Sequence, residues 1–269
     1  MTGDADQFDH DAARAALEWL VELGVDTAVG DAPVNAYELP DHLAQPKPAA
    51  PPADAPALPL RVAEAGPDPV EEARHAAKSA RTLEELREAI AAYDLCPLKK
   101  GAKNTVFSDG NPKARVMVIG EAPGRDEDIQ GKPFVSRAGQ LLDRMFAGIG
   151  LDRNAPDAAH ALYITNVLPW RPPGNREPEA GEIAQMLPFL ARHVELADPD
   201  LIVLMGNAAC TAALNRRGIM RLRGHWTEAF GRPAMPMTHP AYLLRQPHAK
   251  REAWADLLAI RARLDTLPG

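Results

Sequence analysis

Four short apolar runs recur along the chain from residue 116 onward. They occupy residues 116–119, 161–165, 201–205 and 235–238, and the first of them leaves no room for a polar face. Runs of this length that are rich in apolar residues predict strands buried on both faces, as in a parallel sheet. The first run ends in a turn of glycine and proline at 120–124, where the strand passes into a polar loop.

Segments with helical spacing lie between and after these runs. Apolar residues recur at 138–145, and further helices are predicted from about Glu177, where Pro188 kinks or ends the first part, and at 208–215. A closing helix at 249–264 places four apolar residues on one face, Ala253, Leu257, Ile260 and Leu264. Alternating strands and helices predict the α/β class, with a three-layer α/β/α sandwich around a short, four-stranded parallel sheet.

The N-terminal part of the chain has a different composition. Residues 1–45 form an acidic extension with a short amphipathic helix predicted at 11–25, which packs on the core or on a partner protein. Eight prolines among alanines at 46–69 indicate an extended linker. The folded domain is therefore expected to occupy residues 70–269.

The first helix of this domain has a recognisable start signal. Thr82 and Glu85 have the spacing of a capping box, in which the threonine hydroxyl caps the helix and the glutamate reaches back. The helix is predicted to continue to about Tyr93.

The distribution of charge changes what the net charge suggests. The formal net charge is −7, but residues 1–92 hold 18 acidic and 7 basic residues, which leaves 19 acidic and 23 basic residues in the rest. Within 216–251, eight Lys and Arg residues stand against the single acid Glu228. Clustered positive charge favours contacts with nucleic-acid phosphates, although it also serves solubility.

The cysteine content and the absence of long apolar runs indicate the cellular compartment. Two cysteines, Cys96 and Cys210, cannot build a disulfide framework and suit a reducing cytosol. The acidic start is not a secretory signal, and no apolar run approaches the ~18 residues of a membrane span. We therefore expect a monomer in the cytoplasm of a bacterial-type cell, without a membrane partner.

Sequence blocks around the predicted strand ends carry a more specific signal. In chain order they read GEAPG at 120–124, Glu127-Asp128, GKPFV at 131–135, AGQLL at 138–142, YITNV at 163–167, RPPGNR at 171–176 and THPAYLLR at 238–245. In order and spacing these blocks resemble the family 4 uracil-DNA glycosylases, over roughly residues 93–264. The GxGxxG fingerprint and the Walker A lysine are absent, so a nucleotide cofactor is not indicated.

The resemblance implies an enzyme that flips uracil out of single- or double-stranded DNA and hydrolyses its N-glycosidic bond, which begins base excision repair. It implies Phe134 as the stacking platform and the backbone of Gly120, Glu121 and Ala122 as pocket lining. Asn166 has the chemistry to read uracil, because its amide donates to O4 and accepts from N3–H. The alternatives are a core phenylalanine and a turn-capping asparagine.

The resemblance assigns the other roles less sharply. His239 is expected to donate to uracil O2 as negative charge develops on the leaving base. Ala122 cannot act as a base, so Glu121 or Glu127 is left to orient water, and Glu127 could instead exclude the thymine methyl group. The 242–245 segment would supply a wedge for the gap in the duplex and a phosphate contact from Tyr242, Leu243, Leu244 and Arg245, although both leucines could equally be core.

One departure from the family concerns its cofactor. Family members typically hold a [4Fe–4S] cluster through four cysteines, and such a cluster needs about four thiolates. The matching positions here carry Cys96, Lys99, Trp170 and Met186. We therefore expect no cluster and no other cofactor or metal. Cys96 would be a small buried hydrophobe, with Trp170 and Met186 filling the volume of the cluster.

Two alternatives to a hydrolytic glycosylase remain. A related class becomes covalently trapped on its DNA product through a histidine near the RPP segment, but residues 170–178 contain no histidine. A non-catalytic DNA-binding module that kept the fold is disfavoured because Glu121, Glu127, Asn166 and His239 are retained.

Overall fold

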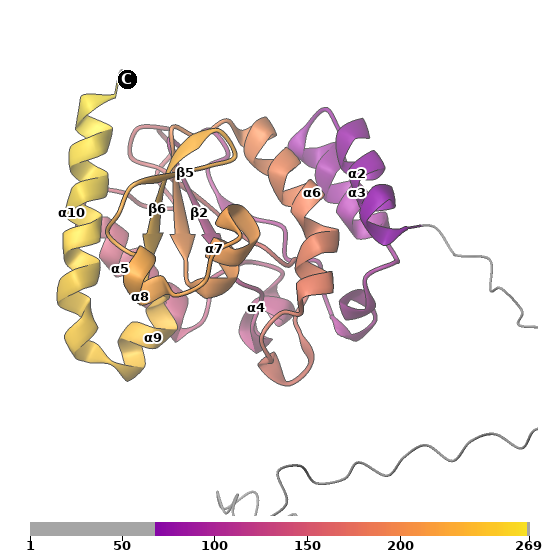
Figure 1. Cartoon of the computed structure of the whole chain (residues 1–269). Coiled ribbons are helices and arrows are strands. Elements are labelled where there is room, and N and C mark those ends of the chain that lie inside the picture. The colour runs from indigo at the N-terminus through magenta and orange to yellow at the C-terminus, as the bar shows by residue number, and fades with distance from the viewer. Residues whose placement is uncertain (1–67, 268–269) are drawn as a thin grey trace, which may run out of the picture. The chain divides into compact units, whose positions relative to one another are not determined.

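A six-stranded sheet forms the centre of the computed structural model, which describes residues 68–267 (Figure 1). The strand order is β1-β3-β2-β4-β6-β5. The inner strands are parallel; they are β2 (Val116–Gly120), β3 (Leu162–Asn166), β4 (Leu201–Met205) and β6 (Arg232–Met237). The predicted four-stranded parallel sheet is thus confirmed. The predicted helix at 11–25 and nearly all of the proline-rich segment lie outside the described residues.

Two short strands at the edges of the sheet were not predicted. β1 (Asp109–Gly110) pairs antiparallel with β3, and β5 (Thr227–Ala229) pairs antiparallel with β6. Strands of two and three residues are too short to show an alternating pattern, so sequence periodicity cannot reveal them.

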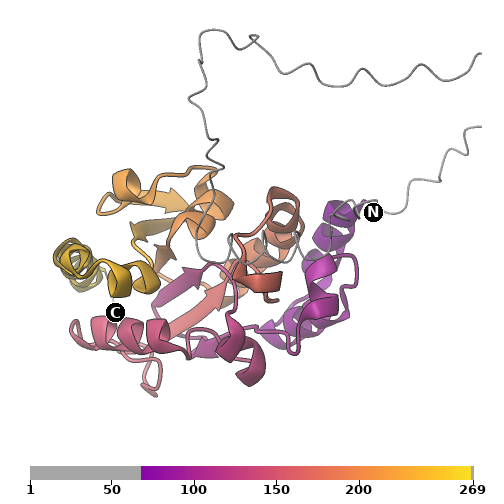
Figure 2. The same cartoon turned by 90° about the horizontal axis from the view of Figure 1, so that it is seen from below.

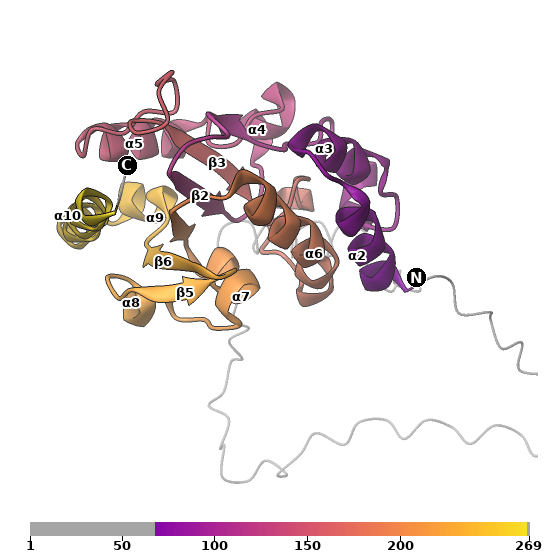
Figure 3. The ribbon, with the colours of Figure 1, turned by 90° about the horizontal axis from the view of Figure 1, so that it is seen from above.

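Helices cover both faces of the sheet (Figure 3). One face packs against α6 (Ala180–Ala197) and α7 (Asn207–Leu214), with α2 (Pro69–Ser79) and α3 (Leu83–Ala92) outside α6. The other face packs against α5 (Arg137–Ala147), α9 (Pro240–Arg245) and α10 (Lys250–Thr266). Alternate residues of each inner strand serve the two faces: Met117 joins one apolar cluster and Val118 the other. This confirms the three-layer α/β/α architecture.

The helix boundaries agree with most of the sequence signals. The Thr82 hydroxyl accepts a hydrogen bond from the Glu85 N–H at 3.1 Å, which confirms the cap, whereas the Glu85 carboxylate accepts from the Arg81 N–H rather than from Thr82. α10 buries the four predicted apolar residues. The helix α2 was missed, although Asp68 caps it and Pro69 occupies its first position, where proline is favoured.

Pro188 does not end the helix that contains it. α6 begins at Ala180, three residues later than predicted, and continues through Pro188 to Ala197. Its buried face, which includes Met186 and Phe189, packs into the core on both sides of the proline. Tertiary packing therefore outweighs the backbone hydrogen bond that proline removes.

The carboxyl ends of the parallel strands meet at one edge of the sheet, seen from below in Figure 2. α4 (Arg125–Gln130) follows β2 there, and α9 follows β6. The remaining helical turns are α8 (Ile219–Leu222) and three 3₁₀ turns at Pro97–Gly101, Pro173–Asn175 and Pro247–Ala249. No helix within residues 68–267 is both long and apolar enough to cross a membrane. In open α/β sheets this edge is where ligands bind.

Candidate functional site

A cleft of about 520 Å³ opens at the carboxyl ends of β2, β3 and β6. Side chains from the sequence blocks named above converge on it, although these blocks are far apart in the chain. Those that line it include Glu121, Ala122, Glu127, Phe134, Asn166, His239, Tyr242 and Arg245. A parallel sheet brings them together because successive strands end at the same edge.

Phe134 forms one wall of the cleft and is held in an unusual backbone conformation. Its φ of 53° lies in the left-handed region, which is costly for an aromatic residue. The ring lies against Gly120, where an added Cβ would come within 2.5 Å of it. Glycine is therefore required at the end of β2, because any side chain there would displace the ring. The His239 ring lies beside it, with centroids 5.4 Å apart and planes inclined by 27°.

Asn166 ends β3 directly beside Gly120, its partner in the sheet register. A Cβ at Gly120 would also meet the Asn166 Oδ1 at 2.3 Å, so the amide and the Phe134 ring share one small space. Asn166 is buried, yet its side-chain amide makes no hydrogen bond to any other residue of 68–267. A capping role would use these groups; here both the donor and the acceptor are left for a ligand in the cleft.

His239 is the N-cap residue of α9, and its ring nitrogens have distinct roles. Nδ1 accepts a hydrogen bond from the Ala241 N–H at 3.2 Å. Burial lowers the pKa of the imidazole to about 4, helped by Arg245 and opposed by Glu127. The ring is therefore neutral at physiological pH, and because Nδ1 accepts, the proton lies on Nε2. Nε2–H is then available as a hydrogen-bond donor.

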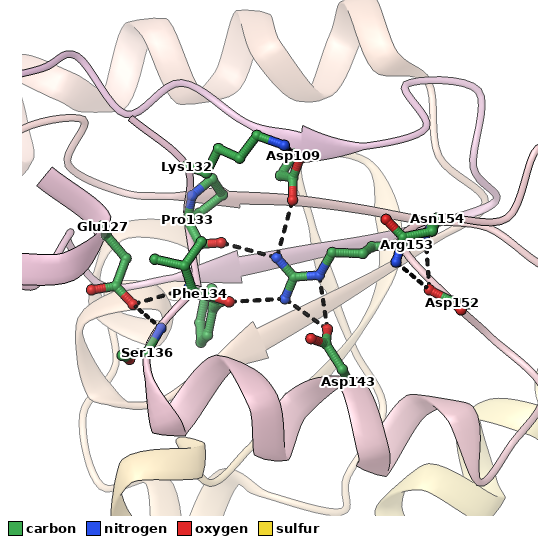
Figure 4. Close-up of polar contacts among 11 residues, drawn as sticks. Asp109, Glu127, Lys132, Pro133, Phe134, Ser136, Asp143, Asp152, Arg153 and Asn154 are labelled. Atoms are coloured by element: carbon green, nitrogen blue, oxygen red, sulfur yellow. Dashed lines mark hydrogen bonds and ion pairs between the residues drawn. The ribbon is translucent and has the colours of Figure 1, made fainter. Parts of the chain in front are cut away.

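Glu127, in the first turn of α4, is buried and supports the loop that carries Phe134 (Figure 4). Its Oε1 accepts from the backbone N–H groups of Val135 and Ser136, at 3.1 and 3.0 Å. A Cβ at Gly124 would come within 2.8 Å of the other oxygen, Oε2. The carboxylate is thus fixed in place by backbone donors on one side and a close backbone approach on the other.

Glu121 is half-buried at the mouth of the cleft. Burial raises the pKa of its carboxyl group, the negative charge of Glu177 raises it further, and Arg217 opposes both. Arg217 and Glu177 form an ion pair at 2.9 Å. Within the described part of the chain, no hydrogen bond holds the Glu121 carboxylate. It is a carboxylate of raised basicity that remains open to the cleft.

Comparison with known proteins matches the chain to a family over the region that contains this site. Residues 107–258 match the family described as "Uracil DNA glycosylase superfamily". The chain belongs to this superfamily. A type-4 uracil-DNA glycosylase of Archaeoglobus fulgidus is 37% identical over 188 residues, which cover 66% of this chain and 92% of that protein. The type-4 uracil-DNA glycosylase of Thermotoga maritima is 36% identical over 166 residues, 61% of this chain and 83% of the relative.

The chain is also similar to part of a much longer protein. A protein of Bacillus phage SP01 named DNA polymerase is 31% identical over 150 residues, which are 56% of this chain but 16% of that protein. A segment similar to this chain thus also occurs within a larger protein.

α9 separates the two leucines of this superfamily member that were predicted as alternative wedges. Leu243 is fully buried in the apolar cluster beneath α5 and α10, whereas Leu244 is only partly buried. Tyr242 and Arg245 line the cleft, and Arg245 is exposed. A helix of six residues thus presents a cleft face and a core face, and sequence alone could not fix which leucine lies on which.

Some cleft residues of the glycosylase fold carried no predicted role. Ser136, Asn175, Arg176 and Glu177 also line the cleft. The last three belong to the RPPGNR block and the residue after it, which follows β3 at the ligand-binding edge of the sheet. Their position after a predicted strand was the available signal.

The residues at the family's iron–sulfur positions do not fit a cluster. Cys96 is buried and supplies the single thiol, while Lys99 donates to the Ala91 carbonyl at 2.5 Å and pairs with Asp94. Trp170 and Met186 are buried in the same apolar cluster as Cys96, and the Trp170 indole donates to the Thr105 hydroxyl at 3.1 Å. Ammonium, indole and thioether groups are not the thiolates that a [4Fe–4S] cluster requires.

Proposed function

We propose that this chain is a monofunctional uracil-DNA glycosylase, which flips uracil out of DNA and hydrolyses its N-glycosidic bond to begin base excision repair. The observation that carries the proposal is the side-chain amide of Asn166, which makes no hydrogen bond within residues 68–267 and lies beside the Phe134 ring, on which the neutral His239 stacks. Membership of the superfamily and the names of the relatives support it.

Recognition of the base would use three side chains. The flipped pyrimidine stacks on Phe134, and Asn166 donates to O4 while accepting from N3–H. Cytosine presents the opposite donor and acceptor at these two atoms, so the amide rejects it. His239 donates through Nε2–H to O2, where negative charge develops as the base leaves with the bonding electron pair.

Hydrolysis would use a carboxylate near the sugar. We assign this role to Glu121, because its carboxylate is open to the cleft, whereas Glu127 already accepts two backbone hydrogen bonds. Glu121 stabilises the positive charge that develops on the sugar and orients the water that adds to C1′. The products are free uracil and an abasic site.

DNA would be held by the exposed basic residues around the cleft mouth. Arg245 is exposed on α9 and contacts a phosphate, while Leu244, beside it, enters the gap left by the flipped base. We further propose that the enzyme acts as a monomer in the cytoplasm, and without an iron–sulfur cluster.

The alternatives find less support. Covalent trapping needs a nucleophilic histidine near the RPP segment, and residues 170–178 hold none. A non-catalytic module would not need Glu121, whose carboxylate lines the cleft and makes no hydrogen bond within residues 68–267.

The experiment that tests the proposal is release of free uracil from an end-labelled oligonucleotide with one uracil. We expect uracil release and an alkali-labile site at the uracil position, and no reaction at cytosine or thymine. A stable covalent adduct would favour the trapping class, and binding without release would favour the non-catalytic module.

A further inference from the structure

Arg153 is a buried arginine behind the cleft wall, in the loop between α5 and β3. Its guanidinium group makes four hydrogen bonds, two to aspartates and two to backbone carbonyls. Nε donates to Asp143 at 2.8 Å and Nη1 donates to Asp109 at 3.2 Å, while Nη2 forms an ion pair with Asp143 at 2.7 Å. Nη1 also donates to the backbone carbonyl of Pro133 at 3.0 Å, and Nη2 donates to that of Phe134 at 3.1 Å (Figure 4).

These two carbonyls belong to the strained part of the cleft wall. Phe134 has a φ of 53°, and its carbonyl group packs so closely on α5 that a Cβ at Gly139 would lie 1.8 Å from the oxygen. A left-handed backbone at an aromatic residue persists only where its surroundings hold it. Gly139 supplies the space, and Arg153 supplies the hydrogen bond that fixes the carbonyl in that space.

The segment is held from its other side by Glu127. Its carboxylate accepts from the N–H groups of Val135 and Ser136, which follow Phe134 directly. The backbone around Phe134 is therefore held by two charged groups: its carbonyls accept from the Arg153 guanidinium, and its N–H groups donate to the Glu127 carboxylate. The hydrogen bonds of both charged groups to this segment go to its backbone.

A purely structural role for Arg153 would be to join α5 and β1 through its two ion pairs. Asp143 lies in α5 and Asp109 in β1. That role would need no contact with the carbonyls of residues 133 and 134. The two aspartates instead hold the planar fork in the orientation in which its remaining N–H groups meet those carbonyls.

We infer that Arg153 is a positioning residue for uracil excision, which acts by holding Phe134 in the conformation that stacks on the flipped base. The inference rests on the proposed function and deepens it. Arg153 itself touches neither base nor sugar.

The test is a double-mutant cycle between Arg153→Gln and Phe134→Ala, read as the single-turnover rate of uracil excision at saturating enzyme. Arg223→Gln is the matched control, because Arg223 likewise forms an ion pair with an aspartate, the buried Asp256, but does not line the cleft. Thermal midpoints are measured for every variant. Arg153→Lys, which keeps the charge and loses the fork, is the second variant in case the glutamine variant does not fold.

We expect Arg153→Gln to slow excision by at least about tenfold, within the range for loss of one base–aromatic stack. In the Phe134→Ala background the same change should slow it by no more than about twofold, since positioning a missing ring has no effect. Arg153→Lys should be intermediate, and Arg223→Gln should lose stability while excising within about threefold of the parent.

Several results would overturn the inference. One is an Arg153→Gln or Arg153→Lys variant that is as active as Arg223→Gln. Another is a double variant whose rate loss equals the product of the two single-variant losses, which would mean that Arg153 acts independently of the ring. A parent chain that releases no uracil would remove the proposed function and this inference together, whereas an active parent with an unaffected Arg153→Gln removes the inference alone.

Discussion

Asn166 is buried beside the cleft, and its side-chain amide makes no hydrogen bond to another described residue. The other buried polar residues named around the cleft do make such hydrogen bonds. Asp128, by contrast, accepts from the Lys103 and Asn104 N–H groups, and Glu127 from those of residues 135 and 136. A buried amide without protein partners is costly unless a ligand satisfies it. The discrimination between uracil and cytosine therefore depends on which atoms this one side chain presents.

Asn166→Asp tests this directly. The substitution keeps the shape but removes the NH₂ donor, so a carboxylate oxygen faces uracil O4 as acceptor against acceptor. We expect uracil excision to fall by ~10⁴-fold or more, as when a site loses a hydrogen bond that reads its substrate. A faint cytosine activity is expected beside it, because the carboxylate accepts from cytosine N4.

Single-turnover cleavage of matched uracil and cytosine oligonucleotides is the measurement, with DNA binding and folding checked separately. A folded variant that excises uracil within tenfold of the parent would move base reading to the backbone around Glu121, and then to His239.

Two neutral histidines make the stability of the fold sensitive to acid. Burial lowers the pKa of His193, which stacks on Phe107 and hydrogen-bonds Tyr163, to about 3, and that of His239 to about 4. The ordinary value is about 6.5. Between pH 6.5 and about 4 the unfolded chain therefore binds more protons than the folded chain, and the free energy of unfolding falls by roughly a few kcal/mol.

The prediction is that the melting temperature falls through this window, and falls less steeply in His193→Gln than in the parent. The comparison between the two proteins isolates the histidine from carboxylates that also titrate in acid. Parallel curves for the two proteins would show that His193 does not contribute. Excision should not be limited by protonation of His239 in the same window, because its ring stays neutral down to about pH 4.

The residue types of the site could be predicted from sequence, but their supports could not. Phe134, Asn166 and His239 were identified because each belongs to a sequence block that resembles the family 4 glycosylases. Arg153 lies in no such block, and its contacts are with backbone carbonyls, which leave no signature in the sequence. Likewise, a positive φ at Phe134 contradicts local preference and follows only from the contacts that enforce it.

At the scale of elements, α9 assigns different tasks to adjacent leucines. Leu243→Ala should lower the free energy of unfolding by about 2–5 kcal/mol, because it opens a cavity in the core, with little effect on excision by the folded enzyme. Leu244→Ala should leave stability almost unchanged and slow excision from double-stranded DNA more than from single-stranded DNA, since only a duplex has a gap to fill.

Denaturant unfolding and excision from paired substrates give the two measurements, and each leucine serves as the control for the other. Equal slowing on single and double strands by Leu244→Ala would argue against a wedge.

The parallel strands could be predicted from the apolar runs, because strands buried on both faces consist mainly of apolar residues. The apolar pattern failed to predict elements that are very short, and it did not show which face of a short helix is buried. β1 and β5 were too short to be seen, and α4 follows a glycine-rich turn with a single helical turn of mostly polar residues. Which residues of α9 face the core could be seen only in the structure, because a six-residue helix has too few turns to define an apolar stripe.

At the scale of the whole molecule, charge and site motifs are separated along the chain. Residues 1–92 carry the acidic excess, and no site motif lies before Gly120. We therefore expect a chain shortened to begin at Asp68, which keeps the cap of α2, to excise uracil at close to the rate of the full chain.

The measurement is single-turnover excision by both chains, with thermal unfolding as the check on folding. A folded short chain that is slower by a hundredfold or more, about 2.7 kcal/mol of barrier, would place the extension in the site.

Protein side chains fill the region where the resemblance to family 4 implies an iron–sulfur cluster. Lys99, Trp170 and Met186 stand at three of the four ligand positions, and their contacts are those of a packed core and a helix end: indole to Thr105, ammonium to the Ala91 carbonyl. A cluster would have to displace these contacts and would find the thiol of Cys96 alone, whose pKa burial raises, so that it resists becoming the thiolate that iron needs.

The purified protein should therefore be colourless, with iron far below one atom per chain and no broad absorbance near 400 nm, and excision should be unaffected by an iron chelator. Incubation with iron and sulfide under reducing conditions should change neither the spectrum nor the melting temperature. Stoichiometric iron with that absorbance would contradict the prediction. It would mean that ligands other than the family's cysteines hold a cluster, and that the packing around Trp170 differs when the cluster is bound.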